Sequence, residues 1–376
     1  MKYSIEIGKI VEGALKHDQS KVLNYTKQLI DKLNQDGDEL AANKFSKQLS
    51  AHNGSTLSVM GMNKELSVPV DSESRTVLAD VIYPNDNRID VILSKENREN
   101  IDTFILSYKN ADRLNSIGIG VANTLLLYGP PGCGKTQCAY LIARELGLPL
   151  IIARLDSLIS SYLGTTAKNI RSLFDFAQKM PCVLFLDEFD AIAKARDDSN
   201  ELGELKRVVN SLLQNVDAMS KDSLLISATN HDKLLDSAVW RRFEYKLEIQ
   251  LPDTNAIIEM IDLFTKRAHN LNAKEKAELA TALTGLSGAN IEEVLVKAIR
   301  KSVIQDKSIE KIDFYNELFE FKGIIPQNCV SKNTLLGIKA LFLRNCNEKI
   351  FSYQVIADIL KSSKTTISKL IKEANT

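Results

Sequence analysis

The chain has 376 residues, of which 44% are hydrophobic, enough for roughly two or three domains that each bury a core. Its 48 basic residues balance 48 acidic ones, so net charge neither indicates nor excludes binding to nucleic acid. The five cysteines lack the paired spacing of metal ligands, which favours reduced thiols and a cytoplasmic location. Charged residues near Met1 argue against a signal peptide, and no apolar run approaches the ~20 residues of a membrane span.

Residues 1–50 are predicted to form a small helical module, because apolar residues recur there at helical spacing. The first apolar stripe consists of Ile5, Ile10, Val11 and Leu15. Such a module can dock a protein substrate or an adaptor, and a packing appendage is an equally good interpretation. Residues 51–75 are polar and rich in turn residues, so they are predicted to be a linker.

Residues 76–253 alternate short apolar runs with helical patterns, which is typical of an α/β domain with a parallel, doubly wound sheet. The predicted strands are residues 125–128, 150–154, 182–187, 223–229 and 246–251. Pro252 breaks the pattern, and a mostly helical small domain is expected at residues 254–322. A further helical segment is expected at residues 331–374.

A glycine-rich segment directly follows the first of these strands. It reads Gly129-Pro130-Pro131-Gly132-Cys133-Gly134-Lys135-Thr136, and a helix follows from Gln137. Glycines allow consecutive backbone N–H groups to surround a phosphate, and the helix N-terminus adds the positive end of its dipole. Lys135 can reach the β- and γ-phosphates, and the Thr136 hydroxyl can hold Mg²⁺. The segment and Gln137 therefore predict a site of the P-loop NTPase type that binds ATP and Mg²⁺.

Two acidic residues, Asp187 and Glu188, end the third predicted strand. Ligands bind at the carboxyl edge of such sheets, so both carboxylates are expected near the phosphates. Asp187 can hold Mg²⁺ through water, and Glu188 can polarise the water that attacks the γ-phosphate. The alternative is a strand that ends in a solvated acidic turn.

Together with further motifs, these residues resemble the AAA+ ATPases, close to the AAA group proper, over about residues 95–320. Residues 223–230 look like the strand that ends in the sensor-1 asparagine, here Asn230. Residues 235–244 resemble the second region of homology, in which Arg241 and Arg242 match the arginine-finger positions. Residues 285–291, with Gly288 and Ala289, look like the small-domain motif that packs on adenine. Tyr162-Leu163-Gly164 matches the pore loop of the family.

The resemblance implies an ATPase that works as a homo-oligomeric ring, expected to be a hexamer, and that remodels or unfolds a protein threaded past Tyr162. The fingers would act on the nucleotide of a neighbouring subunit, because guanidinium groups neutralise transition-state charge. Each of these residues also has a purely structural interpretation. Asn230 can cap a turn, the two arginines can be a basic pair on the surface, and Tyr162 can fold back onto the core. The family usually separates the two arginines, so which of them is the finger stays open. Residues 90–95 also lack the glycines with which the family shields adenine.

Residues 352–372 resemble a helix-turn-helix. Ala357 and Ile367 stand ten residues apart, where that motif places a small and a β-branched residue at the crossing of its helices. The side chains that could then face a major groove are Lys364, Thr365, Thr366, Ser368 and Lys369. Against this, Lys361 occupies the turn position that is usually glycine. A DNA-directed ATPase is therefore the alternative function, and a helical pair that closes the small domain is the alternative structure.

Overall fold

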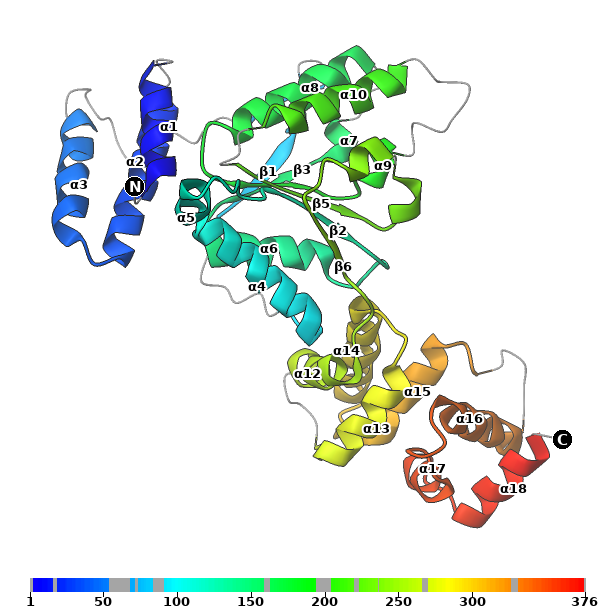
Figure 1. Ribbon diagram of the computed structural model, residues 1–376. Helices are drawn as coiled ribbons and strands as arrows, with labels where there is room; N and C mark the ends of the chain where they lie inside the picture. The colour runs from blue at the N-terminus through cyan, green and yellow to red at the C-terminus, as the bar shows by residue number, and fades with distance from the viewer. Residues whose placement is uncertain are drawn as a thin grey trace. The chain divides into compact units, whose positions relative to one another are not determined.

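The computed structural model describes residues 3–15, 19–53, 68–71, 74–83, 91–158, 163–193, 204–219, 223–235, 237–265, 270–325 and 331–374. The chain divides into two compact units (Figure 1). The sheet unit comprises Met1–Val91, Asn97–Gly129 and Lys135–Ile249. The helical unit comprises Ile92–Glu96, Pro130–Gly134 and Gln250–Thr376. Among the described residues, no helix is both long and apolar enough to cross a membrane.

The first three helices are α1 (Ser4–Leu15), α2 (Gln19–Gln35) and α3 (Glu39–Asn53). Only part of the apolar stripe of α1 is buried, since Ile10 packs against Leu29 and Leu33 whereas Val11 and Leu15 are 51% and 78% exposed. The same helix buries two charged residues, Glu6 and Lys9, which are 2% and 5% exposed. The buried charges are paired: Lys32 Nζ lies 2.5 Å from Glu6 Oε1, and Lys9 Nζ lies 3.3 Å from Glu12 Oε2. Ion pairing offsets the cost of removing these charged side chains from water. Because α1 buries the side that carries them, part of its apolar stripe faces solvent.

A six-stranded sheet forms the centre of the sheet unit, in the order β1-β3-β4-β5-β2-β6. Its strands are β1 (Ala79–Ile82), β2 (Thr124–Tyr128), β3 (Leu150–Ala153), β4 (Val183–Leu186), β5 (Leu224–Thr229) and β6 (Tyr245–Glu248). The five predicted strands are all present and pair in parallel. The structure adds β1, which pairs antiparallel with β3 at the edge of the sheet. The α/β fold with a phosphate-loop sheet is confirmed, with one antiparallel edge strand that the sequence patterns did not predict.

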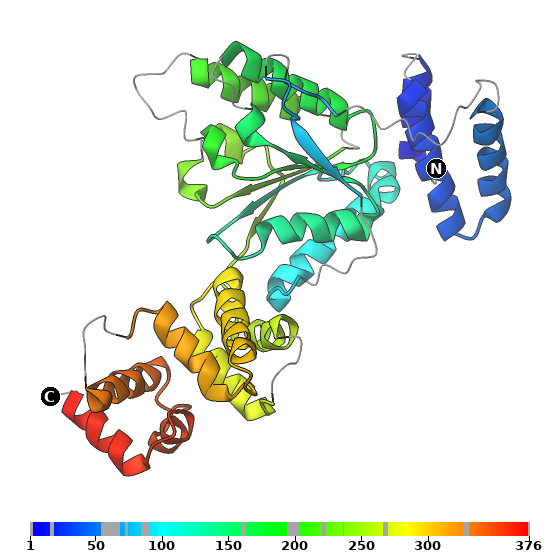
Figure 2. The same cartoon turned by 180° about the vertical axis from the view of Figure 1, so that it is seen from behind.

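Helices cover both faces of this sheet, with α8 and α10 on one face and α4 and α6 on the other (Figure 2). The helices of this unit that follow α3 are α4 (Lys95–Lys109), α5 (Ala111–Ser116), α6 (Lys135–Leu146), α7 (Leu155–Leu158), α8 (Leu163–Ala177), α9 (Asp190–Ala193), α10 (Glu204–Asp217), η2 (Asp232–Leu234) and α11 (Ser237–Trp240). Double coverage explains why the central strands are almost wholly apolar. All four residues of β4 and all six of β5 are buried.

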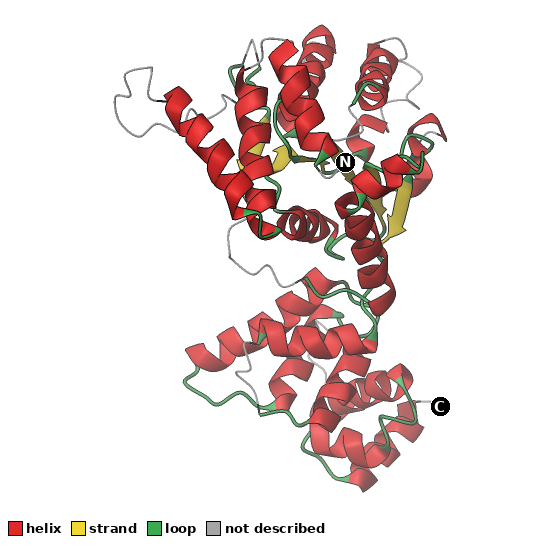
Figure 3. Ribbon diagram, turned by 60° about the vertical axis from the view of Figure 1, so that its left-hand side comes forward, coloured by secondary structure: helices red, strands yellow, loops and turns green. Residues whose placement is uncertain are grey.

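The helical unit is built from seven helices in its described part, and the strands in Figure 3 all lie outside it. These helices are α12 (Thr254–Phe264), α13 (Ala273–Leu283), α14 (Gly288–Ile304), α15 (Lys311–Phe321), α16 (Lys332–Cys346), α17 (Tyr353–Ile359) and α18 (Lys364–Ala374). Polar side chains cap several of them, since Asp253, Ser287, Ser331 and Ser352 each accept a backbone N–H at a helix start. One continuous hydrophobic core runs through the unit, from Ile257 on α12 to Ile371 on α18. The last three helices therefore share a core with the first four.

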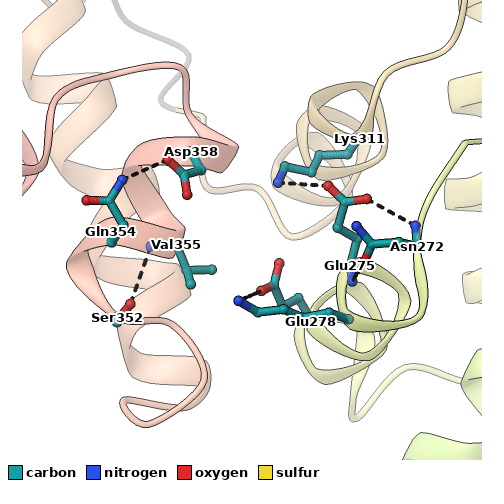
Figure 4. Close-up of polar contacts among 9 residues, drawn as sticks. Asn272, Glu275, Glu278, Lys311, Ser352, Gln354, Val355 and Asp358 are labelled. Atoms are coloured by element: carbon teal, nitrogen blue, oxygen red, sulfur yellow. Dashed lines mark hydrogen bonds and ion pairs between the residues drawn. The ribbon is translucent and has the colours of Figure 1, made fainter.

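A polar cluster lies where α17 faces α13 and α15 (Figure 4). Lys311 Nζ donates to Glu275 Oε1 over 3.2 Å, and Gln354 Nε2 donates to Asp358 Oδ1 over 2.9 Å. Glu278 lies among these groups and is only 5% exposed. Burial raises the pKa of the Glu278 carboxyl, and the groups that add to or oppose this shift are Lys311, Lys274, Glu275 and Asp358.

We expect Glu278→Gln to stabilise the helical unit at neutral pH. The carboxyl pKa is raised above its ordinary value of 4.5, so folding disfavours the charged form and stability falls as pH rises through the folded-state pKa. The melting temperature of the variant should exceed that of the wild type at pH 7 and converge with it below pH 4.5, where both side chains are neutral. Glu292→Gln, on an exposed stretch of α14, is the control and should show no such divergence. An equal difference at both pH values would contradict the assignment.

Candidate nucleotide site

The glycines of the segment between β2 and α6 have backbone conformations that other residues rarely adopt. Gly129, Gly132 and Gly134 have φ angles of 134°, 73° and 91°. A Cβ on Gly129 would lie 2.3 Å from the carbonyl oxygen of Ile249, and a Cβ on Gly132 would lie 2.8 Å from Ser287 Oγ. Both distances are shorter than those that real Cβ atoms show, so this loop conformation requires glycine at the two positions.

Lys135 and Thr136 begin α6 directly after this loop. Lys135 is 7% exposed, and its Nζ donates to the carbonyl oxygen of Gly129 over 2.8 Å, so its charge is held over the loop that precedes it. Thr136 Oγ1 donates to Asp187 Oδ2 over 2.7 Å, which joins the start of α6 to the end of β4. A hydroxyl and a carboxylate side by side are hard oxygen donors of the kind that Mg²⁺ takes together with water and phosphate. Among the described residues, no group of three or more His, Cys, Asp or Glu could hold a metal.

Glu188 follows Asp187 in a strained turn. Its φ is 48°, in the left-handed region that non-glycine residues rarely enter. Its N–H donates to Asp187 Oδ1 over 2.9 Å, and the next N–H, of Phe189, donates to the Ala228 carbonyl over 2.8 Å. The Phe189 ring is buried edge-on against Phe243, with centroids 5.7 Å apart. These contacts hold the turn and leave the Glu188 side chain exposed.

A second network joins this turn to the end of β5. Thr229 Oγ1 donates to Asp190 Oδ1 over 3.0 Å and accepts from the His231 N–H over 3.0 Å. Asn230 lies between Thr229 and His231, and Thr229 is in register with Tyr128, the last residue of β2 before the loop. Asp190 and Thr229 were not among the site residues predicted from the sequence. A hydroxyl and a carboxylate that follow two strands expected to be neighbours are a sequence pattern that would have predicted this pair.

The two adjacent arginines differ in their surroundings. Arg242 forms a bidentate ion pair with Asp217, Nε to Oδ1 at 3.1 Å and Nη2 to Oδ2 at 3.0 Å, and Nη1 donates to the Ala238 carbonyl over 3.0 Å. Arg241 is exposed, and within the described residues no hydrogen bond or ion pair connects its guanidinium to another group. Arg242 is therefore tied to α10, and Arg241 is available to a partner.

In the helical unit, the start of α14 contacts the glycine-rich loop. Ser287 caps this helix, and the Ala289 N–H donates to the carbonyl oxygen of Gly132 over 3.0 Å. Gly288 lies between them, and its Cβ position is 3.4 Å from the same carbonyl. Gly288 and Ala289 are thus brought together with the loop. Tyr162 lies outside the described residues, and Leu163 is the first residue of α8.

Comparison with known proteins agrees with this geometry. The pattern of the "ATPase family associated with various cellular activities (AAA)" matches residues 125–251. An uncharacterized AAA family ATPase of Sinorhizobium fredii is 46% identical over 238 residues, which cover 63% of this chain and 72% of that protein. The chain belongs to the AAA family of ATPases. It is accordingly an ATPase that binds nucleotide.

Other relatives of this AAA ATPase are more distant. The proteasome-activating nucleotidases of Methanococcus maripaludis and Thermococcus onnurineus are 31% and 32% identical over 60% and 58% of this chain. The matches cover 57% and 59% of those two proteins, so more than a third of each has no counterpart here. The crystal structure of the FIGL-1 AAA domain in complex with ADP aligns with a TM-score of 0.55 and 22% identity, over 74% of this chain and 95% of that one. At this identity the likeness concerns the fold.

The strain at Glu188 leads to a stability prediction. Glu188→Gly should raise the free energy of unfolding of the sheet unit by about 1 kcal/mol, because glycine adopts positive φ without the steric cost of a Cβ. Glu188→Gln keeps the Cβ and should melt at the wild-type temperature. Thermal unfolding of the three proteins without nucleotide measures the difference. A glycine variant no more stable than the glutamine variant would show that the turn is not strained.

Proposed function

We propose that this AAA ATPase hydrolyses ATP in a homo-oligomeric ring, expected to be a hexamer, and uses the energy to remodel or unfold a protein. The observation that carries the proposal is the hydrogen bond from Thr136, in the first turn of α6, to Asp187 at the end of β4, directly before the exposed carboxylate of Glu188. Asn230 follows β5, the strand that lies between β2 and β4. A site built for nucleotide binding alone would need no exposed carboxylate at Glu188.

In the proposed mechanism, the backbone N–H groups of the loop and the Lys135 ammonium bind the β- and γ-phosphates. Thr136 and Asp187 would hold Mg²⁺, which supplies positive charge that neutralises the phosphate oxygens. Glu188 accepts a proton from the attacking water, and Asn230 orients that water through a hydrogen bond. The Asp190–Thr229 contact positions Asn230 relative to Glu188, since it ties the two strand ends together.

Completion of the site by a neighbouring subunit is suggested by Arg241. An exposed guanidinium that makes no hydrogen bond or ion pair within the described part of its own subunit suits a γ-phosphate across a subunit boundary, where planar donors neutralise the transferring group. We therefore assign the finger to Arg241 and a positioning role to Arg242, which Asp217 holds.

A protein substrate is supported by the relatives and by Tyr162. Two relatives carry the name proteasome-activating nucleotidase, which describes an ATPase that acts with a protein-degrading partner. An aromatic residue directly before Leu163, the first residue of α8, suits contact with an extended polypeptide irrespective of its sequence. The helices α1–α3 would then dock the substrate or an adaptor, since α1 presents Val11 and Leu15 to solvent.

A DNA-directed ATPase is the second candidate, and the turn between α17 and α18 favours it. Lys361 has a φ of 52°, the left-handed conformation for which a helix-turn-helix usually has glycine. Ala357 and Ile367 are 1% and 0% exposed, as the crossing of such helices requires. DNA-stimulated turnover without substrate remodelling would favour this candidate over the first.

Glu188→Gln tests the hydrolytic mechanism. It should leave ATP binding intact and lower turnover by at least ~10², because the amide cannot accept the proton from water. Lys135→Ala is the contrasting variant and should abolish binding itself. Single-turnover hydrolysis and equilibrium binding of a fluorescent ATP analogue separate the two effects. Wild-type turnover in Glu188→Gln would remove Glu188 from the mechanism, whereas a trapped co-purifying protein would identify the substrate.

Substitution of the two arginines should have different effects on turnover and on the melting temperature. Arg241→Ala should lower turnover by roughly 10³ without changing the melting temperature, because its side chain is exposed and makes no hydrogen bond or ion pair with the residues that the structure describes. Arg242→Ala should lower the melting temperature, and Asp217→Asn should reproduce that loss because it breaks the same ion pair. Mixing Arg241→Ala with Lys135→Ala subunits should restore part of the turnover. Proven mixed rings without such recovery would argue against action between subunits.

Tyr162→Ala tests the remodelling step directly. Basal ATP hydrolysis should persist, because the residue is outside the nucleotide motifs, while unfolding of a fluorescent test protein should stop. Tyr162→Phe is the matched control and should retain most of the unfolding, since it keeps the ring. Unfolding at the wild-type rate by Tyr162→Ala would exclude threading past this residue.

A further inference from the structure

The last three helices present basic side chains in a chain that is neutral overall. Residues 331–374 contain eight Lys and Arg and three Asp and Glu, whereas the whole chain contains 48 of each kind. Lys364 and Lys369 lie on α18 and are exposed, and the buried face of this helix is formed by Ile367 and Ile371. Lys369 Nζ lies 3.8 Å from Glu373 Oε1 in an exposed ion pair, and Lys364 stands beside the exposed Thr365 and Ser363. The exposed face of α18 therefore carries more positive than negative charge.

The helices around α18 place it as the second helix of a helix-turn-helix. Lys361 takes the left-handed turn conformation, and Ser363 caps α18 by accepting the Thr366 N–H over 3.1 Å. Gly337 on α16 faces α18, since a Cβ at this position would lie 3.6 Å from Leu370 Cβ, in ordinary van der Waals contact. Such a helix fits a DNA major groove, and its N-terminal residues are the ones that reach the base edges.

Other basic residues of this segment attach it to the rest of the helical unit. Lys361 forms an ion pair with Glu310, the N-cap of α15. Lys339 Nζ donates to Asn316 Oδ1 over 2.9 Å and lies 5.0 Å from the centroid of the Phe319 ring. Phe319 in turn packs edge-on against Phe342, with centroids 5.9 Å apart. The helix-turn-helix is thus fastened to α15 through polar and aromatic contacts as well as through the shared core.

The same unit contains the loop that binds phosphate. Pro130–Gly134 clusters with the helical unit, and the bond from the Ala289 N–H to the Gly132 carbonyl joins the loop to α14. The chain of contacts from the loop through α14 and α15 to α17 and α18 lies within one compact unit. A change of the loop on nucleotide binding acts on the unit that carries α18.

We infer that α18 contacts duplex DNA, and that the nucleotide bound at the phosphate loop sets the affinity of this contact. The inference rests on the second candidate function and adds its regulation. Coupling between two sites is reciprocal, so DNA must change the affinity for nucleotide by the factor by which nucleotide changes the affinity for DNA.

The first experiment measures binding of full-length protein to a labelled mixed-sequence duplex, by fluorescence anisotropy, without nucleotide, with ADP and with a non-hydrolysable ATP analogue. We expect the affinities in the nucleotide states to differ by at least about fivefold. The logarithm of affinity should fall with the logarithm of salt by about 0.9 per phosphate contact. The Lys364→Ala, Lys369→Ala double variant should flatten that slope by about two units. Lys307→Ala, an exposed lysine between α14 and α15, is the matched control and should leave the slope unchanged.

The second experiment tests the coupling through the loop. Ala289→Pro removes the N–H that bonds to Gly132, at a position in the first turn of α14 where proline is tolerated. At saturating nucleotide, this variant should bind DNA with equal affinity in all nucleotide states, whereas Ala289→Gly, which keeps the N–H, should retain the difference. Titration of a fluorescent ATP analogue with and without DNA should give the reciprocal factor in the wild type.

The outcomes separate the two levels of the proposal. Undetectable binding of DNA at low salt overturns both the contact and the second candidate function, and it leaves protein remodelling untouched. Binding that is equal in all nucleotide states overturns the coupling and leaves a DNA contact in place. A nucleotide-dependent affinity that Ala289→Pro does not change overturns the route through the Gly132 carbonyl.

Discussion

The hydrogen bond from Thr136 to Asp187 joins the first turn of α6 to the end of β4, and it exists because β2, β5 and β4 are parallel neighbours. Parallel strands end at the same edge of a sheet, so the loop after β2 and the acidic turn after β4 meet although 51 positions separate the two residues. Asn230, at the end of the strand between them, completes the set. With another strand order, these residues would lie at different places along the edge of the sheet.

Close packing holds the irregular parts of the site in place. Two hydrogen bonds hold the left-handed backbone of Glu188: its own N–H donates to Asp187, and the N–H of Phe189 donates to the Ala228 carbonyl. The buried ring of Phe189 adds a packing contact next to it. Strain of this kind persists only where the surroundings over-determine it. Asp190 and Thr229 supply a second tie of the same sort. The result is an exposed carboxylate whose direction is set by a rigid turn.

The helical unit links two features that are far apart in the sequence. The phosphate loop contacts α14, and the core that α14 contributes to continues to α18. Packed cores move as blocks more readily than they deform, which is the physical basis of the coupling proposed above between the loop and α18. In the sheet unit, by contrast, Asp217 restrains one of two adjacent arginines and leaves the other to solvent. One ion pair thereby gives two chemically identical side chains different surroundings.

Much of the fold and of the nucleotide site could be predicted from the sequence, because the signals are local. The loop from Gly129 to Thr136 and the apolar runs of the five parallel strands depend on residues that are adjacent in the chain. The edge strand β1 has no such signal, since only its pairing with β3 makes it a strand. Gly288 and Ala289 were expected near adenine, and their contact with the carbonyl of Gly132 is a tertiary observation.

Three features were decided by tertiary structure alone. Arg242 differs from Arg241 because Asp217, 25 positions away, lies within reach of only one of them. Lys361, in the left-handed turn between α17 and α18, is ion-paired with Glu310, 51 positions away at the start of α15. The stripe of Val11 and Leu15 faces solvent because the buried Glu6 is paired with Lys32 from the next helix. In each case a partner distant in sequence supplies the energy, and a local pattern contains no information about where that partner lies.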